Sequence, residues 1–308
     1  MNFQSMNYFT MAAQKRSFTK AAEALYITQQ TLSVHIAAIE REIGCQLFVR
    51  HVPLELTYAG EIFLQYALDF QKKYRAMQHE FGDISHNRKG KLRIGIAHTR
   101  GRTILPGLIE KFQKANPRIE IQVIENPNDT LQKNLLDGDI DLAIANFPDK
   151  VLGIALRDFY EEEVVLLISE ELLTGLFGDG AETIVHKIAS DGDASLLRRC
   201  PFVLNNQQDI AGKVGRELIA EAGFRPIVKA QSENIETLLD LCARGVGACF
   251  CPENLIRPAL SEKQISKLRI FRFRKNGTSY MIRFGWMKQT YQWRVISEFM
   301  DQAIGSAD

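Results

Sequence analysis

Residues 17–50 constrain the chain most, because they contain two short helical patterns separated by only a few residues. The first pattern covers about 18–25 and carries two adjacent alanines where another helix can pass close. The second follows Thr28, whose hydroxyl can cap the free amides of the next turn. Apolar residues then recur at steps of four, three and four until Gly44, which predicts one buried stripe made of Leu32, Ile36, Ile39 and Ile43.

The second helix points amides, a hydroxyl and small side chains away from this stripe, at about 100° per residue. Gln29, Gln30 and Ser33 lie toward its N-terminal end, and such residues hydrogen-bond base edges in the major groove of DNA. Val34 is also outward and can touch a thymine methyl group. Two short helices joined by a tight turn predict a helix-turn-helix. An ordinary helix pair in a bundle has the same pattern, so the pattern alone leaves both interpretations open.

The order of motifs in this segment resembles the N-terminal domain of the LysR-type transcriptional regulators. That family carries Ser-Phe-Thr-x-Ala-Ala-x-x-Leu, Thr/Ser-Gln, Leu-Ser, Ile-x-x-Leu/Ile-Glu and Leu-Phe-x-Arg in this order, and all of them occur within residues 17–50. The Leu-Thr-Tyr-Ala-Gly at 56–60 is close to the family's Leu-Thr-x-Ala-Gly. The resemblance implies a winged helix-turn-helix domain at residues 1–58 that binds a double-stranded DNA operator.

The resemblance also assigns DNA contacts to polar residues of the two helices and of the wing. Departures from the family pattern affect these contacts, and one is Val34, which stands where the family often has Arg or another long polar residue. Arg16 occupies a turn position where the family has Gly, which predicts strain at positive φ, and Gln30 replaces a frequent Pro. The wing lacks the usual basic residues, so we expect fewer phosphate contacts there. The predicted DNA-binding residues are Ser17, Thr19, Thr28, Gln29, Gln30, Thr31, Ser33, His35 and Arg50.

Charge and composition limit the partners. The net charge of the 308 residues is +1, and residues 1–60 hold five Lys or Arg against four Asp or Glu. DNA binding must therefore depend on helix N-termini and a few placed side chains. No run approaches the ~18 apolar residues of a membrane span, and the start lacks a signal peptide's basic head and apolar core. With five scattered cysteines, these features predict a cytoplasmic protein without a membrane partner.

After residue 57 the pattern changes to a heptad-like repeat over about three heptads. A long helix packed on its own chain is one interpretation, but the polar residues that flank the narrow seam favour a partner helix. The resemblance agrees: it implies a dimerisation linker helix at 59–88, a homodimer that can assemble into a homotetramer, and RNA polymerase as a further partner. The seam residues are Phe63, Ala67, Phe70, Tyr74, Met77, Phe81 and Ile84.

Residues 89–308 alternate strand and helix patterns, which predicts βαβ units with parallel strands. Leu-Pro-x-Leu-x-x-x-Phe at 105–112 and Gly-x-x-Asp-Leu-Ala-Ile at 138–144 resemble motifs of the family. The resemblance implies an effector-binding domain similar to periplasmic binding proteins, with subdomain I at about 91–162 and 267–308 and subdomain II at about 163–266. The predicted fold class is α/β with an N-terminal all-α winged helix-turn-helix domain, a long linker helix and this two-subdomain region.

Ligands of open α/β sheets bind beyond the carboxyl ends of the strands. Residues 98–103 follow the first strand of this region, and we expect them to form a loop that leads into a helix near Thr103. Amides at that helix start and the guanidinium groups of Arg100 and Arg102 could converge on an anion, which predicts a small anionic effector. Together with positions that family sites use, the predicted effector-binding residues are Thr99, Arg100, Arg102, Asn128, Asn146, Phe202 and Gly247.

Other chemistries have weaker signals. Cys249 and Cys251 share one face of a predicted strand near Cys242, but a zinc site needs a fourth ligand and no His is near in sequence. We therefore expect buried thiols that pack as small hydrophobes. No Ser-His-Asp, Walker or dinucleotide fingerprint is evident, so we predict no catalysis, no metal and no cofactor. A two-lobed solute-binding protein or enzyme is the alternative, although a solute-binding protein would lack the helix-turn-helix and carry an export signal.

Overall fold

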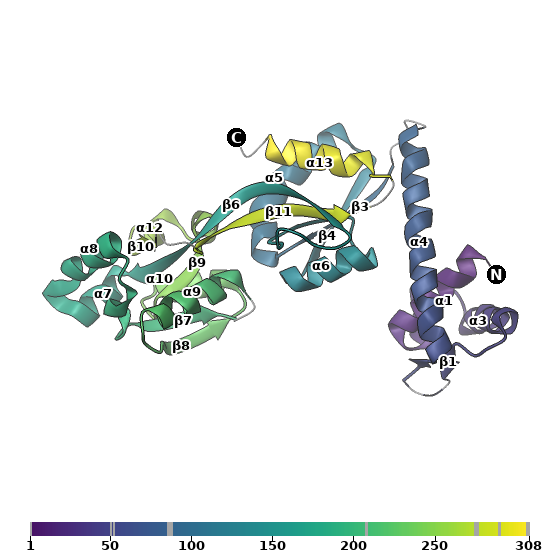
Figure 1. The fold of residues 1–308 in the computed structure, drawn as a ribbon, viewed down its shortest axis with the longest axis horizontal. Coiled ribbons are helices and arrows are strands. Elements are labelled where there is room, and N and C mark those ends of the chain that lie inside the picture. Colours follow the sequence, from purple (N-terminus) through teal and green to yellow (C-terminus); the bar gives the residue numbers. More distant parts are fainter. Residues whose placement is uncertain are drawn as a thin grey trace. The chain divides into compact units, whose positions relative to one another are not determined.

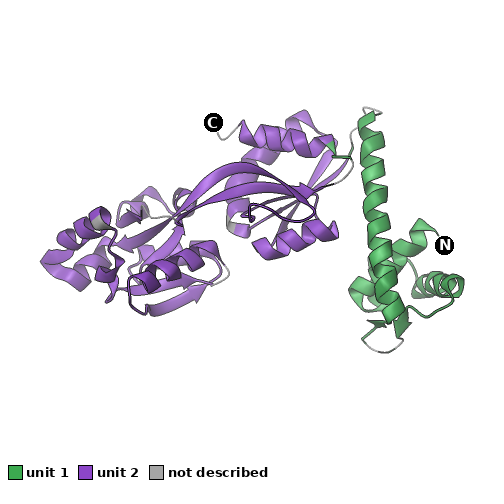
Figure 2. Ribbon diagram, viewed as in Figure 1, with its two compact units in different colours: residues 1–89, 290–293 green, residues 90–289, 294–308 purple. Residues whose placement is uncertain are grey.

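The computed structural model describes residues 2–49, 51, 53–84, 89–206, 209–273, 277–288 and 291–305. The chain forms two compact units, residues 1–89 with 290–293 and residues 90–289 with 294–308 (Figure 2). The first unit contains both the predicted DNA-binding segment and the predicted linker helix. The second unit contains the α/β region.

Three helices and a two-stranded antiparallel hairpin begin the first unit. The predicted stripe is confirmed at Leu32, Ile36 and Ile39, which are buried, whereas Ile43 is 41% exposed at the helix end. Gly44 ends that helix in the left-handed conformation, at φ 82°. The elements are α1 (Phe3–Lys15), α2 (Phe18–Ala24), α3 (Gln29–Ile43), β1 (Phe48–Val49) and β2 (Glu55–Leu56) (Figure 1).

The long helix α4 (Tyr58–Ile84) completes the first unit. Its N-terminal part packs on the three short helices, because Phe63 and Ala67 are buried in their shared core. These two residues of the predicted seam are therefore not available to a partner helix. The seam stays exposed further along α4, at Phe70, Met77, Phe81 and Ile84.

The second unit is built on a mixed seven-stranded sheet with the order β10-β6-β11-β5-β3-β4, in which β9 also pairs with β6. Its first lobe contains the predicted parallel strands, and β11 enters that sheet antiparallel to β5, so the sheet is not parallel throughout. The first lobe comprises β3 (Gly90–Ile96), α5 (His98–Ala115), β4 (Ile119–Glu125), α6 (Asn128–Asp137), β5 (Leu142–Ala145), β11 (Ser279–Met287) and α13 (Arg294–Ile304).

Two strands connect the lobes. The 16-residue strand β6 (Ile154–Ser169) runs from one lobe into the other and pairs antiparallel with β11, so the two strands lie side by side (Figure 1). The strand β10 (Leu268–Arg272) was expected in the first lobe, but it pairs with the second-lobe end of β6. The chain therefore returns to the first lobe after β10, not before it.

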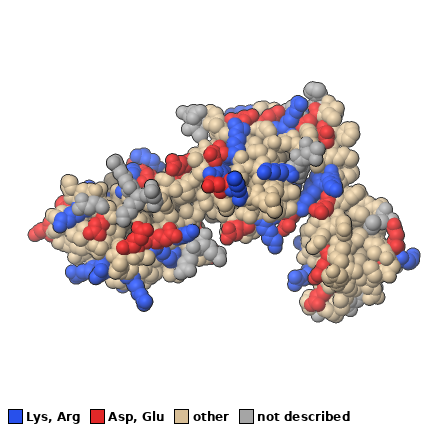
Figure 3. Space-filling model, viewed as in Figure 1, with Lys and Arg blue, Asp and Glu red and all other residues tan. Residues whose placement is uncertain are grey.

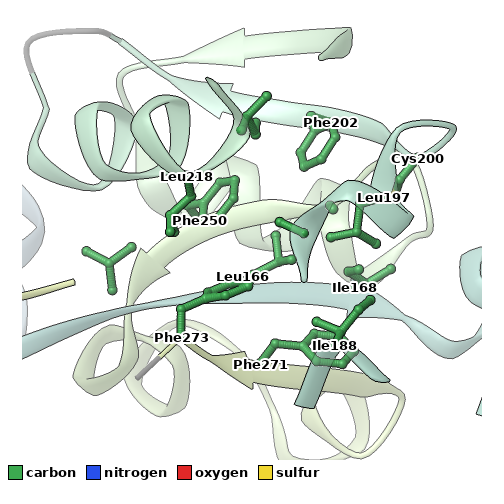
Figure 4. Packing of buried hydrophobic residues seen from close by; sticks show 14 of the residues in the cluster. Leu166, Ile168, Ile188, Leu197, Cys200, Phe202, Leu218, Phe250, Phe271 and Phe273 are labelled. Atoms are coloured by element: carbon green, nitrogen blue, oxygen red, sulfur yellow. The ribbon is translucent and has the colours of Figure 1, made fainter. Parts of the chain in front are cut away.

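The second lobe surrounds a core of buried aromatic and aliphatic side chains from many elements (Figure 4). Burying a large apolar side chain contributes about 1.5–3 kcal/mol, so this core holds the lobe together. Besides β10, the lobe comprises α7 (Glu170–Phe177), η1 (Gly178–Gly180), α8 (Ala181–Asp191), η2 (Ala194–Leu197), β7 (Pro201–Asn205), α9 (Ile210–Glu221), β8 (Ile227–Ser232), α10 (Ile235–Ala243), β9 (Cys249–Pro252), η3 (Glu253–Leu255), α11 (Ile256–Ala259) and α12 (Glu262–Ile265).

Candidate functional site

The first candidate site is the N-terminal end of α3. The Thr28 side chain accepts a hydrogen bond from the Thr31 amide at 3.1 Å, as the sequence predicts for a helix cap. Gln29, Gln30 and Thr31 are exposed there, and Val34 is 63% exposed one turn further on. The helix therefore offers amide, hydroxyl and methyl groups of the kinds that contact bases in a major groove.

The remaining predicted DNA-binding residues have more varied places. Ser17 caps α2 by accepting from the Lys20 amide at 3.3 Å, and the exposed Thr19 hydroxyl donates to Gln29 Oε1 at 3.5 Å. Ser33 is half-buried on α3. Arg50 lies outside the described residues.

His35 is held inside the first unit. Its Nδ1 lies 2.9 Å from the Ser5 hydroxyl, and its ring packs edge-on against Tyr8. These contacts connect α3 to α1, so at least one ring nitrogen is occupied within the protein. Contacts of this kind hold α3 in a fixed orientation on α1.

Among the described residues, two that are not glycine have positive φ, and they lie in the turns on either side of α2. Arg16 has φ 48°, as its departure from the family pattern predicts, and its carbonyl accepts from the Leu54 amide of the wing. Tyr26 has φ 54° and is 97% exposed between α2 and α3. The sequence analysis did not single out Tyr26, and only its place in the turn could have indicated it.

Charge adds little to this surface. In the view of Figure 3 the first unit is mostly tan, with only scattered blue and red side chains. This agrees with the near balance of five basic and four acidic residues in residues 1–60. Binding to DNA must therefore come mainly from placed polar groups and helix amides.

The second candidate site lies between the lobes of the second unit. The expected loop at 98–103 is wrong, because α5 begins at His98 and includes all six of these residues. Its N-cap, Ala97, makes no side-chain cap hydrogen bond, so no cap residue marks the helix start in the sequence. Arg100 and Arg102 thus project from a helix, and the side chain of Thr99 lies outside the described part of the chain.

Arg100 is buried and paired with Glu162 on β6. Its Nε and Nη2 donate to the two carboxylate oxygens at 2.9 and 2.8 Å, and only 6% of Arg100 and 2% of Glu162 are exposed. Burial opposes both charges, but the pairing outweighs it: the pKa of Arg100 is raised and that of Glu162 is lowered. The guanidinium that was expected to bind an anion is therefore already neutralised by a protein carboxylate.

Glu162 also gathers groups from both lobes. The Tyr280 and Tyr160 hydroxyls donate to it at 2.6 and 2.8 Å, and Asn254 Nδ2 donates at 3.2 Å. Arg100 comes from the first lobe, Asn254 from the second, and the two tyrosines from the connecting strands. This carboxylate is therefore the centre of a polar network at the junction of the two lobes, which we call the hinge.

The other predicted effector residues do not come together. Arg102 pairs with Glu236 of α10 across the lobes. Asn146 Nδ2 donates to the Met281 carbonyl at 3.0 Å inside the first lobe. Phe202 is fully buried and stacks on Phe250 in the second-lobe core (Figure 4), and a Cβ at Gly247 would meet the Phe202 backbone at 2.9 Å.

A cavity of about 350 Å³ does open between the lobes. It takes in two of the predicted residues, Arg100 and Asn128. The sequence analysis missed its acidic lining, although Glu125 and Glu233 both follow the rule that ligands bind beyond strand ends. The lining residues are Ala97, His98, Arg100, Glu125, Asn126, Pro127, Asn128, Asn206, Asp209, Glu233 and Asn234.

Three buried cysteines of the second lobe are held in the thiol form. Burial raises the pKa of Cys200 to about 12 and that of Cys251 well above its ordinary value. Hydrogen bonding to Cys242 and burial together do the same for Cys249. Within the described residues, no group of three or more His, Cys, Asp or Glu side chains could hold a metal ion. None of the described helices combines the length and apolar character that a membrane crossing needs.

Comparisons with known proteins match both regions of the chain. The family model of the bacterial regulatory helix-turn-helix proteins, lysR family, matches residues 3–61, and that of the LysR substrate binding domain matches residues 85–307. The HTH-type transcriptional regulator YcgK of Bacillus subtilis (strain 168) is 30% identical over 83% of this chain and 81% of its own. The regulator IlvY of Escherichia coli (strain K12) is 25% identical over 82% of each chain.

Solved structures show the same fold. A full-length OxyR variant from Pseudomonas aeruginosa superposes with a TM-score of 0.70 at 20% identity, covering 98% of this chain and 94% of its own. CbnR, a LysR family transcriptional regulator, gives a TM-score of 0.63 at 20% identity over all of both chains.

A helix-turn-helix unit joined to a two-lobed substrate-binding region defines a DNA-binding transcriptional regulator with its own effector domain. The chain belongs to the LysR family of these regulators. The predictions of family, fold class and regulatory rather than enzymatic function are confirmed, and the solute-binding alternative is set aside.

Proposed function

We propose that two copies of this chain bind an operator through α3 and respond to a small molecule in the cavity between the lobes. The observation that carries the proposal is the exposed N-terminal end of α3, with Gln29 and Gln30 beside a capped first turn. Glutamine can pair with adenine through two hydrogen bonds, and helix N-termini favour phosphate. CbnR, which has this fold, has been solved with its target DNA, which supports DNA binding here. Operator binding places the protein in the cytoplasm.

The exposed part of the α4 seam supports dimerisation. Phe70, Met77 and Phe81 are 48%, 44% and 63% exposed, at spacings of seven and four residues. A two-fold-related helix could cover these apolar side chains, and two α3 helices would then meet the two halves of a symmetric operator.

The cavity supports control by a ligand. It is lined by residues of both lobes, so a molecule bound there contacts both. A ligand that binds one lobe arrangement better than another shifts the population toward it, and by no more than that difference in affinity. The change would reach DNA through the dimer.

Gel-shift and footprinting assays with the full-length protein and the intergenic DNA upstream of its own gene test the proposal. We expect a protected, two-fold-related site and much weaker binding to random DNA of equal length. Binding to both DNAs with equal affinity would contradict operator recognition.

Sedimentation of a Phe70→Asp/Met77→Asp variant tests the dimer. Charges in an apolar interface are costly, so we expect monomers and loss of operator binding. A Gln65→Asp/Gln78→Asp variant is the matched control, because it adds the same charges at exposed polar positions of α4. An unchanged oligomer in the first variant would show that dimerisation uses another surface.

A further inference from the structure

The cavity between the lobes is lined by three carboxylates from different elements. Glu125 ends β4 in the first lobe, while Asp209 precedes α9 and Glu233 follows β8 in the second. Arg100 is the one Lys or Arg among the described residues of this lining, and Glu162 behind the wall neutralises it. His98 pairs with Glu125, with its Nδ1 2.6 Å from Oε2. The lining therefore carries an excess of negative charge.

The same wall contains a buried hydrogen-bond acceptor that lacks a donor. Asn128 Oδ1 is buried and has no hydrogen-bond partner among the described residues. Leaving a buried acceptor without a donor destabilises a protein, so this atom favours a ligand that donates. Asp209 Oδ1 accepts from the amides of Ala211 and Gly212 at 2.9 and 3.2 Å and from Asn205 Nδ2 at 3.2 Å, which leaves its other oxygen for the cavity.

Burial raises the pKa of Asp209, although those two amides and the charge of Arg100 oppose the rise. A carboxylate in this condition gains from a nearby cation. The cavity volume of about 350 Å³ suits an organic molecule, and the described carboxylates do not converge as metal ligands would.

We propose that the effector carries a protonated amine or guanidinium group, which lies among Glu125, Asp209 and Glu233 and donates a hydrogen bond to Asn128. This inference rests on the proposed function, because it assumes that the cavity is the effector site. The group would contact acids of both lobes and remove the repulsion between their like charges. Binding would therefore favour the arrangement in which the lobes are close.

The test is calorimetric titration of the full-length protein with three classes of probe. The cations are L-arginine, L-lysine and 1,4-diaminobutane, the neutral probe is 1,4-butanediol, and the anion is succinate. We expect at least one cation to bind and the other two classes to bind more weakly. Asp209→Asn and Glu233→Gln should each weaken the binding of that cation roughly 10- to 150-fold, because charge-assisted hydrogen bonds are lost.

Both substitutions keep an oxygen that can accept the existing hydrogen bonds, so the fold should persist. Glu217→Gln is the matched control, since it removes the same charge from an exposed position of α9 that does not line the cavity. It should leave the affinity unchanged.

The outcomes separate the inference from the proposed function. Tight binding of succinate or butanediol that Asp209→Asn leaves unchanged or strengthens, or silence of every cation, overturns the inference of a cationic effector. If a probe binds but Asp209→Asn, Glu233→Gln and Asn128→Leu all leave its affinity unchanged, the cavity is not the effector site and that part of the proposed function fails as well.

Discussion

The N-terminal end of α3 and the hinge between the lobes differ in whether their polar side chains are exposed or buried. On α3, Gln29 and Gln30 are exposed and take no part in the core of their unit. At the hinge, Arg100 and Glu162 are buried and bond to groups from both lobes. A change at Gln29 or Gln30 should therefore alter binding alone, whereas a change at the hinge should alter stability together with any response to a ligand.

The largest expected effect comes from Glu162→Gln, which leaves the Arg100 charge buried without its counter-ion. Breaking a buried pair in this way costs about 3–5 kcal/mol, so the free energy of unfolding of the second unit should fall by that amount. Urea denaturation of the full-length protein measures it. Glu163→Gln on the same strand is the control and should cost less than about 0.5 kcal/mol.

A double variant, Arg100→Met/Glu162→Leu, tests the cause of that loss. Because it removes both charges, it should recover much of the stability that Glu162→Gln loses. If the double variant is less stable than Glu162→Gln, packing or the tyrosine hydrogen bonds, and not the orphaned charge, explain the loss.

Low pH should reduce the difference in unfolding free energy between the wild type and Glu162→Gln. The pKa of Glu162 is lower in the folded protein than its usual value of about 4.3, so its contribution is complete above that value and disappears as the pH falls through the folded pKa. Unfolding free energies of wild type and Glu162→Gln should therefore converge as the pH falls below about 4.3. A constant difference down to the acid limit would show that ionisation of Glu162 does not stabilise the fold.

These two regions also differ in how far the sequence predicts them. The first unit is predictable because its signals are local: Leu32, Ile36 and Ile39 follow helical spacing, and Thr28 is a recognisable cap. The hinge is not, because Arg100 and Glu162 are 62 positions apart and nothing in the sequence pairs them. The sequence also predicts a start of α5 near Thr103 that is too late. Ala97 provides no cap signal, and residues 98–103 are polar and contain a glycine.

The effector residues illustrate the same limit. Asn128 and Arg100 were found from the strand-end rule, which is topological and needs no distances. Phe202 is predicted from the positions that family sites use, but it lies inside β7, and the side-chain direction at its position leads into the core. Alternation along so short a strand does not reveal which face the second-lobe helices cover.

On α3 we expect an effect on DNA binding without one on stability. Gln29→Ala or Gln30→Ala should weaken binding to the operator by about 1–3 kcal/mol while binding to random DNA barely changes. Fluorescence anisotropy with both DNAs at one fixed salt concentration measures this. Equal losses on the two DNAs would mean that these side chains contact the backbone and do not read bases.

Thr28→Ala should affect both stability and DNA binding, because Thr28 caps α3 at the end that we propose contacts DNA. Loss of an N-cap costs about 1 kcal/mol of stability, with a range of about 0.5–2. Thr28→Ser keeps the cap oxygen and is the matched control. Thermal unfolding should show a lower Tm for the alanine variant and a nearly unchanged Tm for the serine variant, and equal values for all three proteins would show that the cap does not stabilise the unit.

The smallest expected effect is a gain in stability from Arg16→Gly. A non-glycine residue in the left-handed region costs about 1–2 kcal/mol, and Arg16 has φ 48°. Glycine relieves that strain but loses about 0.5–1 kcal/mol through the greater freedom of the unfolded chain, so the net gain should be about 0–1.5 kcal/mol. For a unit of this size that corresponds to a rise in Tm of a few degrees, roughly 4–8 °C per kcal/mol.

Lys15→Gly, one residue earlier and still helical, is the control and should lower the Tm, because glycine weakens a helix where no strain is relieved. If Arg16→Gly also lowers the Tm, the turn is held by the hydrogen bond from the Leu54 amide to the Arg16 carbonyl, and backbone strain there is too small to matter.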